Sequence, residues 1–163
     1  MSVRVQGEDF DIGAEVARLT AGRTDIGAVV TFTGTVRGTP GGGAIRAMTL
    51  EHYPGMTERE LEAVETQARA RWPLQASLIV HRVGRLVPGD NIVLVVTASA
   101  HREAAFAAAE FLMDYLKTRA PFWKKEETED GQGRWVDARE SDDRAVERWE
   151  GAGPAAAKVT SKA

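Results

Sequence analysis

The stretch "SLIVHRVGRLVPGDNIVLVVTAS", residues 77–99, decides the fold class of this chain. Its two apolar runs, "SLIVHRVGRL" and "NIVLVVTAS", predict two strands. The residues "VPGD" between them predict a turn, because Pro-Gly favours the type II geometry. The second run is continuously apolar from Ile92 to Val96, as is typical of a strand at the centre of a sheet. The chain is therefore expected to be built around a sheet that contains both strands.

The segments before this pair also predict strands. The run "IGAVVTFTGTVR" (26–37) is rich in Val and Thr, and "IRAMTLEHY" (45–53) alternates apolar and polar residues. The residues between them, "GTPGGG" (38–43), predict a flexible loop. Near the other end of the chain, "RWVDARE" (134–140) is a candidate for a short strand.

Helices are predicted between and after these strands. The first begins at Thr57, which is followed three residues later by Glu60 in the capping-box pattern, and it ends at Pro73. A short terminal helix is expected at "SDDRAVERWE" (141–150).

A further helix follows the central strand directly, with Ser99 as its expected N-cap. It should stop near residues 117–119, because Ala120 precedes a proline and is disfavoured in the helical conformation. Strands and helices mixed in this order predict an α+β fold, with a mainly antiparallel sheet packed against helices. Residues 1–150 are expected to form a single domain, and 151–163 a disordered tail with nothing to bury.

Composition restricts the class of protein. The chain has 163 residues, 43% of them apolar, which suits one globular domain. Acids outnumber bases by 24 to 21, which argues against a general nucleic-acid binder. The chain has no cysteine, so disulfides and thiolate sites are excluded. It also lacks both a membrane-length apolar run and a secretory leader, and we expect a cytoplasmic protein.

The segment "LKTRAPFWKKE" (116–126) concentrates positive charge in this acidic chain. Its cationic side chains are Lys117, Arg119, Lys124 and Lys125. Cations in a last helical turn complement the helix dipole, but that accounts only for the first two of them. We expect Phe122 and Trp123 to anchor the segment and turn the second pair back towards the first. Such a cluster would suit a small anionic substrate.

Two other places carry cations of interest. His101 and Arg102 are expected in the first turn of a helix, where unpaired N–H groups and the dipole attract an anion. Arg37 ends a predicted strand next to the glycine-rich loop, which lacks the ending of a phosphate-binding P-loop. An exposed helix turn and a plain mobile hairpin are the alternative interpretations of these two places.

Other chemistries find little support. The sequence "HRE" at 101–103 has part of the zinc deaminase pattern but lacks its cysteines. The histidines show no metal-binding spacing, and His81, inside an apolar strand, is expected to be a packed or edge residue. A serine triad stays open, without a nucleophile-elbow motif to support it. Neither a metal nor a cofactor is expected.

Taken in order, five motifs resemble the large, catalytic subunit of molybdopterin synthase, from about residue 5 to residue 149. They are "GAVVTFTGTVR", "MTLEHYPGM", "HRVGRLVPGD", "SAHR" and "DYLKTRAPFWKKE". The resemblance implies an α/β hammerhead-like fold and a sulfurtransferase. Such an enzyme converts cyclic pyranopterin monophosphate (precursor Z) into molybdopterin by adding two dithiolene sulfurs, in molybdenum cofactor biosynthesis.

The resemblance also implies partners. The sulfur would arrive as a thiocarboxylate on the C-terminal Gly-Gly of a small ubiquitin-like subunit, whose tail enters a pocket of the large subunit. The assembly would be a heterotetramer around a homodimer of large subunits. A sulfur donor of this kind agrees with the absence of cysteine.

Residue by residue, the resemblance makes Lys117 the principal catalytic lysine and Lys124 a second one near the substrate. His101 and Arg102 would contact an anion across the dimer interface. Further substrate contacts are implied for Thr35, Val36, Arg37, Lys125 and Glu126, and pocket walls for Phe32 and Met113. The glycine-rich loop departs from the more polar loop of the family, which puts substrate contacts from it in doubt.

Two rival hypotheses remain open at this stage. One is a non-catalytic binder of anions or single-stranded nucleic acid that uses Trp123 with its lysines as a stacking platform. The other is a structural dimer that has lost catalysis, against which the presence of Lys117, Lys124 and Arg37 argues.

Overall fold

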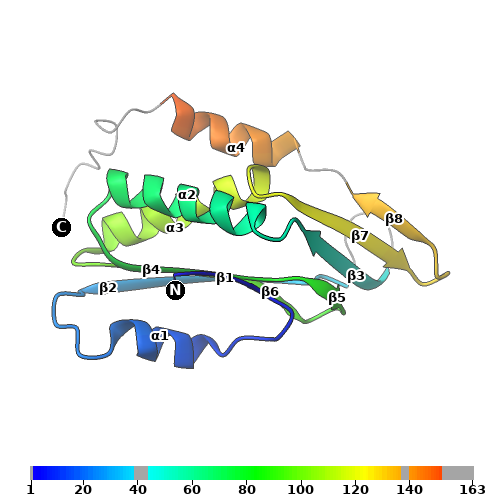
Figure 1. Ribbon diagram of the computed structural model, residues 1–163, viewed down its shortest axis with the longest axis horizontal. Helices are drawn as coiled ribbons and strands as arrows, with labels where there is room; N and C mark the ends of the chain where they lie inside the picture. The colour runs from blue at the N-terminus through cyan, green and yellow to red at the C-terminus, as the bar shows by residue number, and fades with distance from the viewer. Residues whose placement is uncertain (1, 39–43, 137–139, 152–163) are drawn as a thin grey trace.

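The computed structural model describes residues 2–38, 44–136 and 140–151 (Figure 1). Within these ranges the elements are β1 (Val3–Gln6), α1 (Ile12–Thr20), β2 (Ala28–Thr35), β3 (Ile45–His52), α2 (Met56–Arg71), β4 (Leu74–Arg82), β5 (Gly84–Leu86), β6 (Asn91–Ser99), α3 (Arg102–Thr118), β7 (Phe122–Thr128), β8 (Gly133–Val136) and α4 (Glu140–Glu150). The fold is an α+β single domain, as predicted. No helix within the described ranges is long and apolar enough to cross a membrane.

The first sheet has the strand order β1-β4-β6-β2. Strand β6 lies between β4 and β2 and is antiparallel to both, which confirms the prediction of a central strand. Only the β1–β4 pairing in this sheet is parallel. The predicted turn before β6 is also confirmed, because Gly89 has a φ of 93° and the Asp90 N–H donates to the Val87 carbonyl at 3.0 Å.

The prediction of a single strand over residues 77–86 was wrong. Strand β4 ends at Arg82, and β5 begins at Gly84 in a different sheet. Gly84 has a φ of 93°, in the left-handed region that a glycine adopts without steric penalty, so the extended backbone is interrupted there. The chain thereby passes from one sheet to the other.

The second sheet has the order β5-β3-β7-β8, and all its pairings are antiparallel. It lies beyond one end of the first sheet, on the side where α3 leads into β7 (Figure 1). The strand predicted at 134–140 is present as β8, but residues 137–139 lie outside the described part of the chain.

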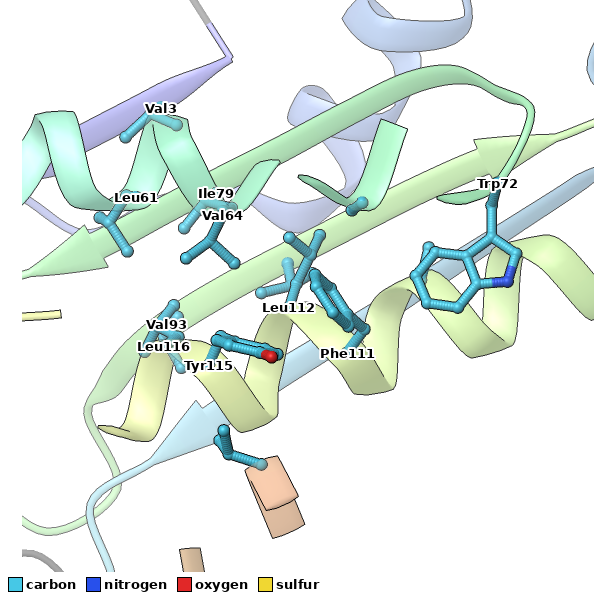
Figure 2. Close-up of a cluster of buried hydrophobic side chains, with 14 residues drawn as sticks. Val3, Leu61, Val64, Trp72, Ile79, Val93, Phe111, Leu112, Tyr115 and Leu116 are labelled. Atoms are coloured by element: carbon cyan, nitrogen blue, oxygen red, sulfur yellow. The ribbon is translucent and has the colours of Figure 1, made fainter. Parts of the chain in front are cut away.

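Helices cover both faces of the first sheet. Helix α1 lies on one face, and α2 and α3 lie on the other with α4 stacked beyond them (Figure 1). The larger core is on the α2–α3 side, where Phe111, Leu112 and Tyr115 of α3 point towards α2 and the sheet (Figure 2). Side chains alternate between the two faces along β4 and β6. Leu78 and Val80 of β4, with Leu94 and Val96 of β6, therefore point to the α1 side instead.

The sequence analysis predicted no element before residue 26, yet β1 and α1 lie there. A signal was present, because Asp11 caps α1 by accepting a hydrogen bond from the Ala14 N–H at 2.9 Å. The residues after it, Ile12, Val16 and Leu19, recur at helical spacing and pack on the smaller core.

Both predicted helix caps were wrong. Helix α2 starts at Met56 with Gly55 as its N-cap, and the Gly55 N–H donates to Glu58 at 2.5 Å. Thr57 is buried inside the first turn instead, where its hydroxyl donates to the Pro121 carbonyl at 3.0 Å. The hydroxyl of Thr57 is thus used by an acceptor that is distant in the sequence. The local capping-box pattern gives no information about such an acceptor.

Ser99 likewise ends β6 rather than capping α3. Its hydroxyl donates to the Pro73 carbonyl at 2.8 Å, and His101 takes the N-cap position without a side-chain hydrogen bond. The predicted ends were better, since α2 ends before Pro73 and α3 ends at Thr118. The helix predicted at 141–150 is present as α4, and the tail predicted from 151 lies outside the described residues except for its first.

Candidate active site

A cavity of about 310 Å³ opens where the two sheets meet the C-terminal end of α3. Its walls come from both sheets and from that helix. The lining residues are Phe32, Gly34, Thr35, Val36 and Arg37 from β2 and its end; Ile45, Met48 and Leu50 from β3; His81, Ile92 and Val93 from β4 and β6; Met113, Leu116, Lys117 and Ala120 from α3 and its end; and Phe122, Lys124, Glu126 and Val136 from β7 and β8. Phe32 and Met113 are among them, as the family resemblance implied.

Lys117 reaches the cavity from the last turn of α3. A cation is favourable there because the helix dipole presents its negative end. The helix stops one residue later, and the chain turns through Ala120 and Pro121 into β7, which brings Lys124 to the same cavity. Of the second pair of lysines that was predicted to return towards the first cations, Lys124 does so, whereas Lys125 does not line the cavity.

Strand β7 presents alternate residues to opposite sides. Phe122, Lys124 and Glu126 line the cavity, whereas Trp123 and Lys125 do not. Trp123 is 48% exposed, so the prediction that it anchors the segment was wrong, and Phe122 alone packs against the core. The ammonium of Lys125 lies 5.8 Å from the centre of the Trp135 ring, on the face away from the cavity.

Among the residues that the structure describes, Glu126 is the only carboxylate that lines the cavity, and it is 6% exposed. Arg134 lies opposite it on β8, with the guanidinium 3.5 Å from a carboxylate oxygen. Because burying a carboxylate without a partner is costly, this ion pair offsets part of the cost of placing Glu126 beside the cavity.

Arg37 stands at the rim, where the backbone before it is fixed by a turn. The Val36 N–H donates to the Asp90 carbonyl and the Gly89 N–H donates to the Val36 carbonyl, both at 2.9 Å. The register shifts between Gly34 and Thr35, so the strand leaves its ladder just before this point. Thr35, Val36 and Arg37 all line the cavity, while residues 39–43 of the glycine-rich loop lie outside the described chain.

His101 and Arg102 lie at the opposite end of α3 and do not line this cavity. At 1.5 Å of rise per residue, they stand roughly 22 Å along the helix from Lys117. Both side chains are exposed. One chain alone therefore does not bring them to the cavity, and any contact they make with its ligand requires a second copy.

His81 was predicted to be a packed or edge residue; it is packed, and it also lines the cavity. It is buried, and its ring stacks on Phe122 with 3.8 Å between ring centres and 18° between ring planes. Burial, and to a smaller extent electrostatic repulsion from Lys117 and His52, lowers the pKa of His81 from 6.5 to about 4, although the hydrogen bond to the Arg82 carbonyl acts to raise it. A polar residue in the apolar run "LIVHR" was the available signal.

The titratable side chains that line the cavity, within the described part of the chain, are three cations, one carboxylate and a neutral imidazole. Within the described ranges, no group of three or more His, Cys, Asp or Glu side chains is placed to hold a metal ion. Cations converging on a small cavity at the junction of two sheets define an enzyme-like site for a small anionic molecule.

Comparison with known proteins shows the family to which this chain is similar. The model described as "MoaE protein" matches residues 5–119. The molybdopterin synthase catalytic subunit of Mesorhizobium japonicum is 58% identical over 149 residues, which cover 91% of this chain and 92% of the relative.

Solved structures agree with this match. The MoaE protein of Burkholderia ambifaria has 56% identity and a TM-score of 0.78, with 91% of this chain and 97% of that chain covered. Molybdopterin synthase from Staphylococcus aureus has 32% identity and a TM-score of 0.76, with 82% and 95% covered. The chain belongs to the MoaE family, the catalytic subunits of molybdopterin synthase, which are enzymes of molybdenum cofactor biosynthesis.

Proposed function

We propose that the cavity is the place where sulfur is transferred from a thiocarboxylated small subunit to precursor Z. The observation that carries the proposal is the convergence of Arg37, Lys117 and Lys124, from three separate elements, on one cavity of about 310 Å³. Both reactants are anionic, since one carries a cyclic phosphate and the other a thiocarboxylate. Fixed cations are what such a pair of reactants needs in order to be bound side by side.

The two lysines are proposed to do the chemical work. The ammonium groups of Lys117 and Lys124 would hold the thiocarboxylate and stabilise the charge that develops as the carbon–sulfur bond of its acyl group breaks. Arg37 at the rim would take the phosphate, and Thr35 and Val36, which line the cavity beside it, would contact the substrate. Glu126 would contact the pterin from the same face of β7 as Lys124.

The proposed partner is a small ubiquitin-like sulfur carrier that ends in Gly-Gly. Support comes from a structure described as a protein–protein complex of subunits 1 and 2 of molybdopterin-converting factor from Helicobacter pylori, which shares the fold at 19% identity and a TM-score of 0.68. The cavity is open to solvent at Arg37 and Lys117, so an extended tail can reach it.

A homodimer at the centre of a heterotetramer is proposed from the family resemblance. The placement of His101 and Arg102 supports it, because they serve the substrate only if a second copy is present. Lys125 lies on the outer face of β7, over the Trp135 ring, and does not line the cavity of its own chain. The cytoplasmic location and the division into domain and tail stay predictions.

The test is a reconstituted assay with purified large subunit, thiocarboxylated small subunit and precursor Z. Lys117→Ala should lose at least about 100-fold in molybdopterin formation, because a group that stabilises developing charge is removed. Arg119→Ala is the matched control, since Arg119 pairs with Glu150 and does not line the cavity. Wild-type turnover by Lys117→Ala would contradict the proposed role of Lys117.

A further inference from the structure

His81 brings a nitrogen acceptor into the cavity, whereas the other nitrogen-bearing side chains among the described lining residues, Arg37, Lys117 and Lys124, are donors. The residue lies at the end of β4, next to Arg82, with its ring against Phe122 at a centre-to-centre distance of 3.8 Å. Its exposed fraction is 5%, so the ring has little freedom to turn. The stack and the strand together fix the plane of the imidazole.

The hydrogen bond at the other ring nitrogen fixes the tautomer. Nδ1 of His81 lies 2.8 Å from the Arg82 carbonyl oxygen. A carbonyl can only accept, so Nδ1 carries the proton and donates it. In the neutral ring Nε2 is then an unprotonated acceptor at the tip of the side chain, pointing away from the backbone.

The surroundings keep the ring neutral. Burial, with electrostatic repulsion from Lys117 of α3 and His52 of β3, holds the pKa of His81 near 4, although the hydrogen bond to the Arg82 carbonyl acts to raise it. Lys124 and Glu126 from β7 line the same cavity. At neutral pH the imidazole therefore offers an acceptor without adding charge.

We propose that His81 is a substrate-binding residue, whose Nε2 accepts a hydrogen bond from an N–H group of the pterin ring. This inference rests on the proposed function, because it takes precursor Z as the ligand of the cavity. The phosphate and the thiocarboxylate are acceptors and suit the cations, but a pterin also carries N–H donors. Cations cannot accept hydrogen bonds from those donors, so the acceptors among the described lining side chains, His81 with Glu126 and Thr35, have to pair them. Donors left unpaired weaken binding.

Three variants separate hydrogen bonding from packing. His81→Phe keeps a ring to stack on Phe122 and removes the acceptor. His81→Gln removes the ring and returns an acceptor oxygen at about the reach of Nε2. His52→Gln is the matched control, since His52 pairs with Glu58 and does not line the cavity.

The experiment measures equilibrium binding of precursor Z to the assembled complex by calorimetry, followed by KM and kcat in the sulfur-transfer assay. We expect His81→Phe to weaken binding and raise KM about tenfold, the loss of one hydrogen bond, with kcat changed less than about twofold. His81→Gln should stay within about threefold of wild type, as should His52→Gln. Circular dichroism checks that each variant is folded.

Several results of these measurements would contradict the proposed role of His81. If His81→Phe binds precursor Z as wild type does, or if only His81→Gln loses affinity, the ring serves packing alone and the inference is wrong. If kcat falls while binding is unchanged, the same conclusion holds. If wild type itself does not bind precursor Z, the proposed function fails, and the inference fails with it.

Discussion

The two faces of strand β7 share one backbone and similar residue types, yet only one face builds the site. Phe122, Lys124 and Glu126 line the cavity, whereas Trp123 is half exposed and Lys125 lies over the Trp135 ring. Each face carries one aromatic ring and one lysine. Residue type alone therefore does not show which lysine faces the cavity. The position of the lysine in the two-residue alternation of the strand shows it.

The largest effect should separate the two adjacent lysines. Lys124→Ala should reduce molybdopterin formation by about 100- to 1,000-fold, because a cation facing the reacting groups is lost. Lys125→Ala should reduce it by less than about fivefold, since its ammonium lies on the outer face. Steady-state rates at saturating partner and substrate measure both. Equal losses would mean that the side of the strand does not decide function.

His81, which stacks on Phe122 of the cavity-facing side of β7, should make the stability of the protein depend on pH. His81 takes up a proton near pH 6.5 in the unfolded chain and near pH 4 in the folded one, so between these values the unfolded state binds more protons. Stability therefore falls as the pH is lowered from 6.5 to 4, by up to about 3 kcal/mol from this residue.

Denaturant unfolding at several pH values, for wild type and His81→Phe, measures this contribution. The wild-type protein should lose more stability than the variant across that window, since the variant has no imidazole to protonate. Parallel pH profiles would show that His81 is not the group responsible. Other acid-sensitive carboxylates contribute equally to both proteins and cancel in the difference.

The smallest effect in this comparison concerns the two neighbouring aromatic rings. Phe122→Ala should lower the free energy of unfolding by about 2–3 kcal/mol, because the ring packs on the core and on His81. Trp123→Ala should lower it by less than about 1 kcal/mol, since the ring is 48% exposed. Chemical denaturation measures both, and a greater loss for Trp123→Ala would overturn the assignment of the buried face.

Elements whose character is set locally could be predicted from the sequence. The apolar run of β6, the turn at Pro88–Gly89 and the end of α3 before Pro121 all follow from neighbouring residues. The family motifs supplied the cavity residues Lys117 and Lys124, which the structure brings together.

Features that depend on distant contacts could not be predicted. Thr57 bonds to the Pro121 carbonyl and Ser99 to the Pro73 carbonyl, so neither hydroxyl is available to cap a helix. The position of His81 against Phe122 depends on the meeting of two sheets. The spacing of apolar residues along the chain predicts strands and helices, but it does not predict which sheets contact each other.

The cavity has a mechanical consequence because its walls belong to two separate hydrogen-bonded ladders. His81 is in the first ladder and Phe122 in the second, and their stacked rings lie at the joint between them. A molecule that fills the cavity would contact both sheets at once. Binding in the cavity would therefore add contacts between the two sheets beyond the stacked rings of His81 and Phe122.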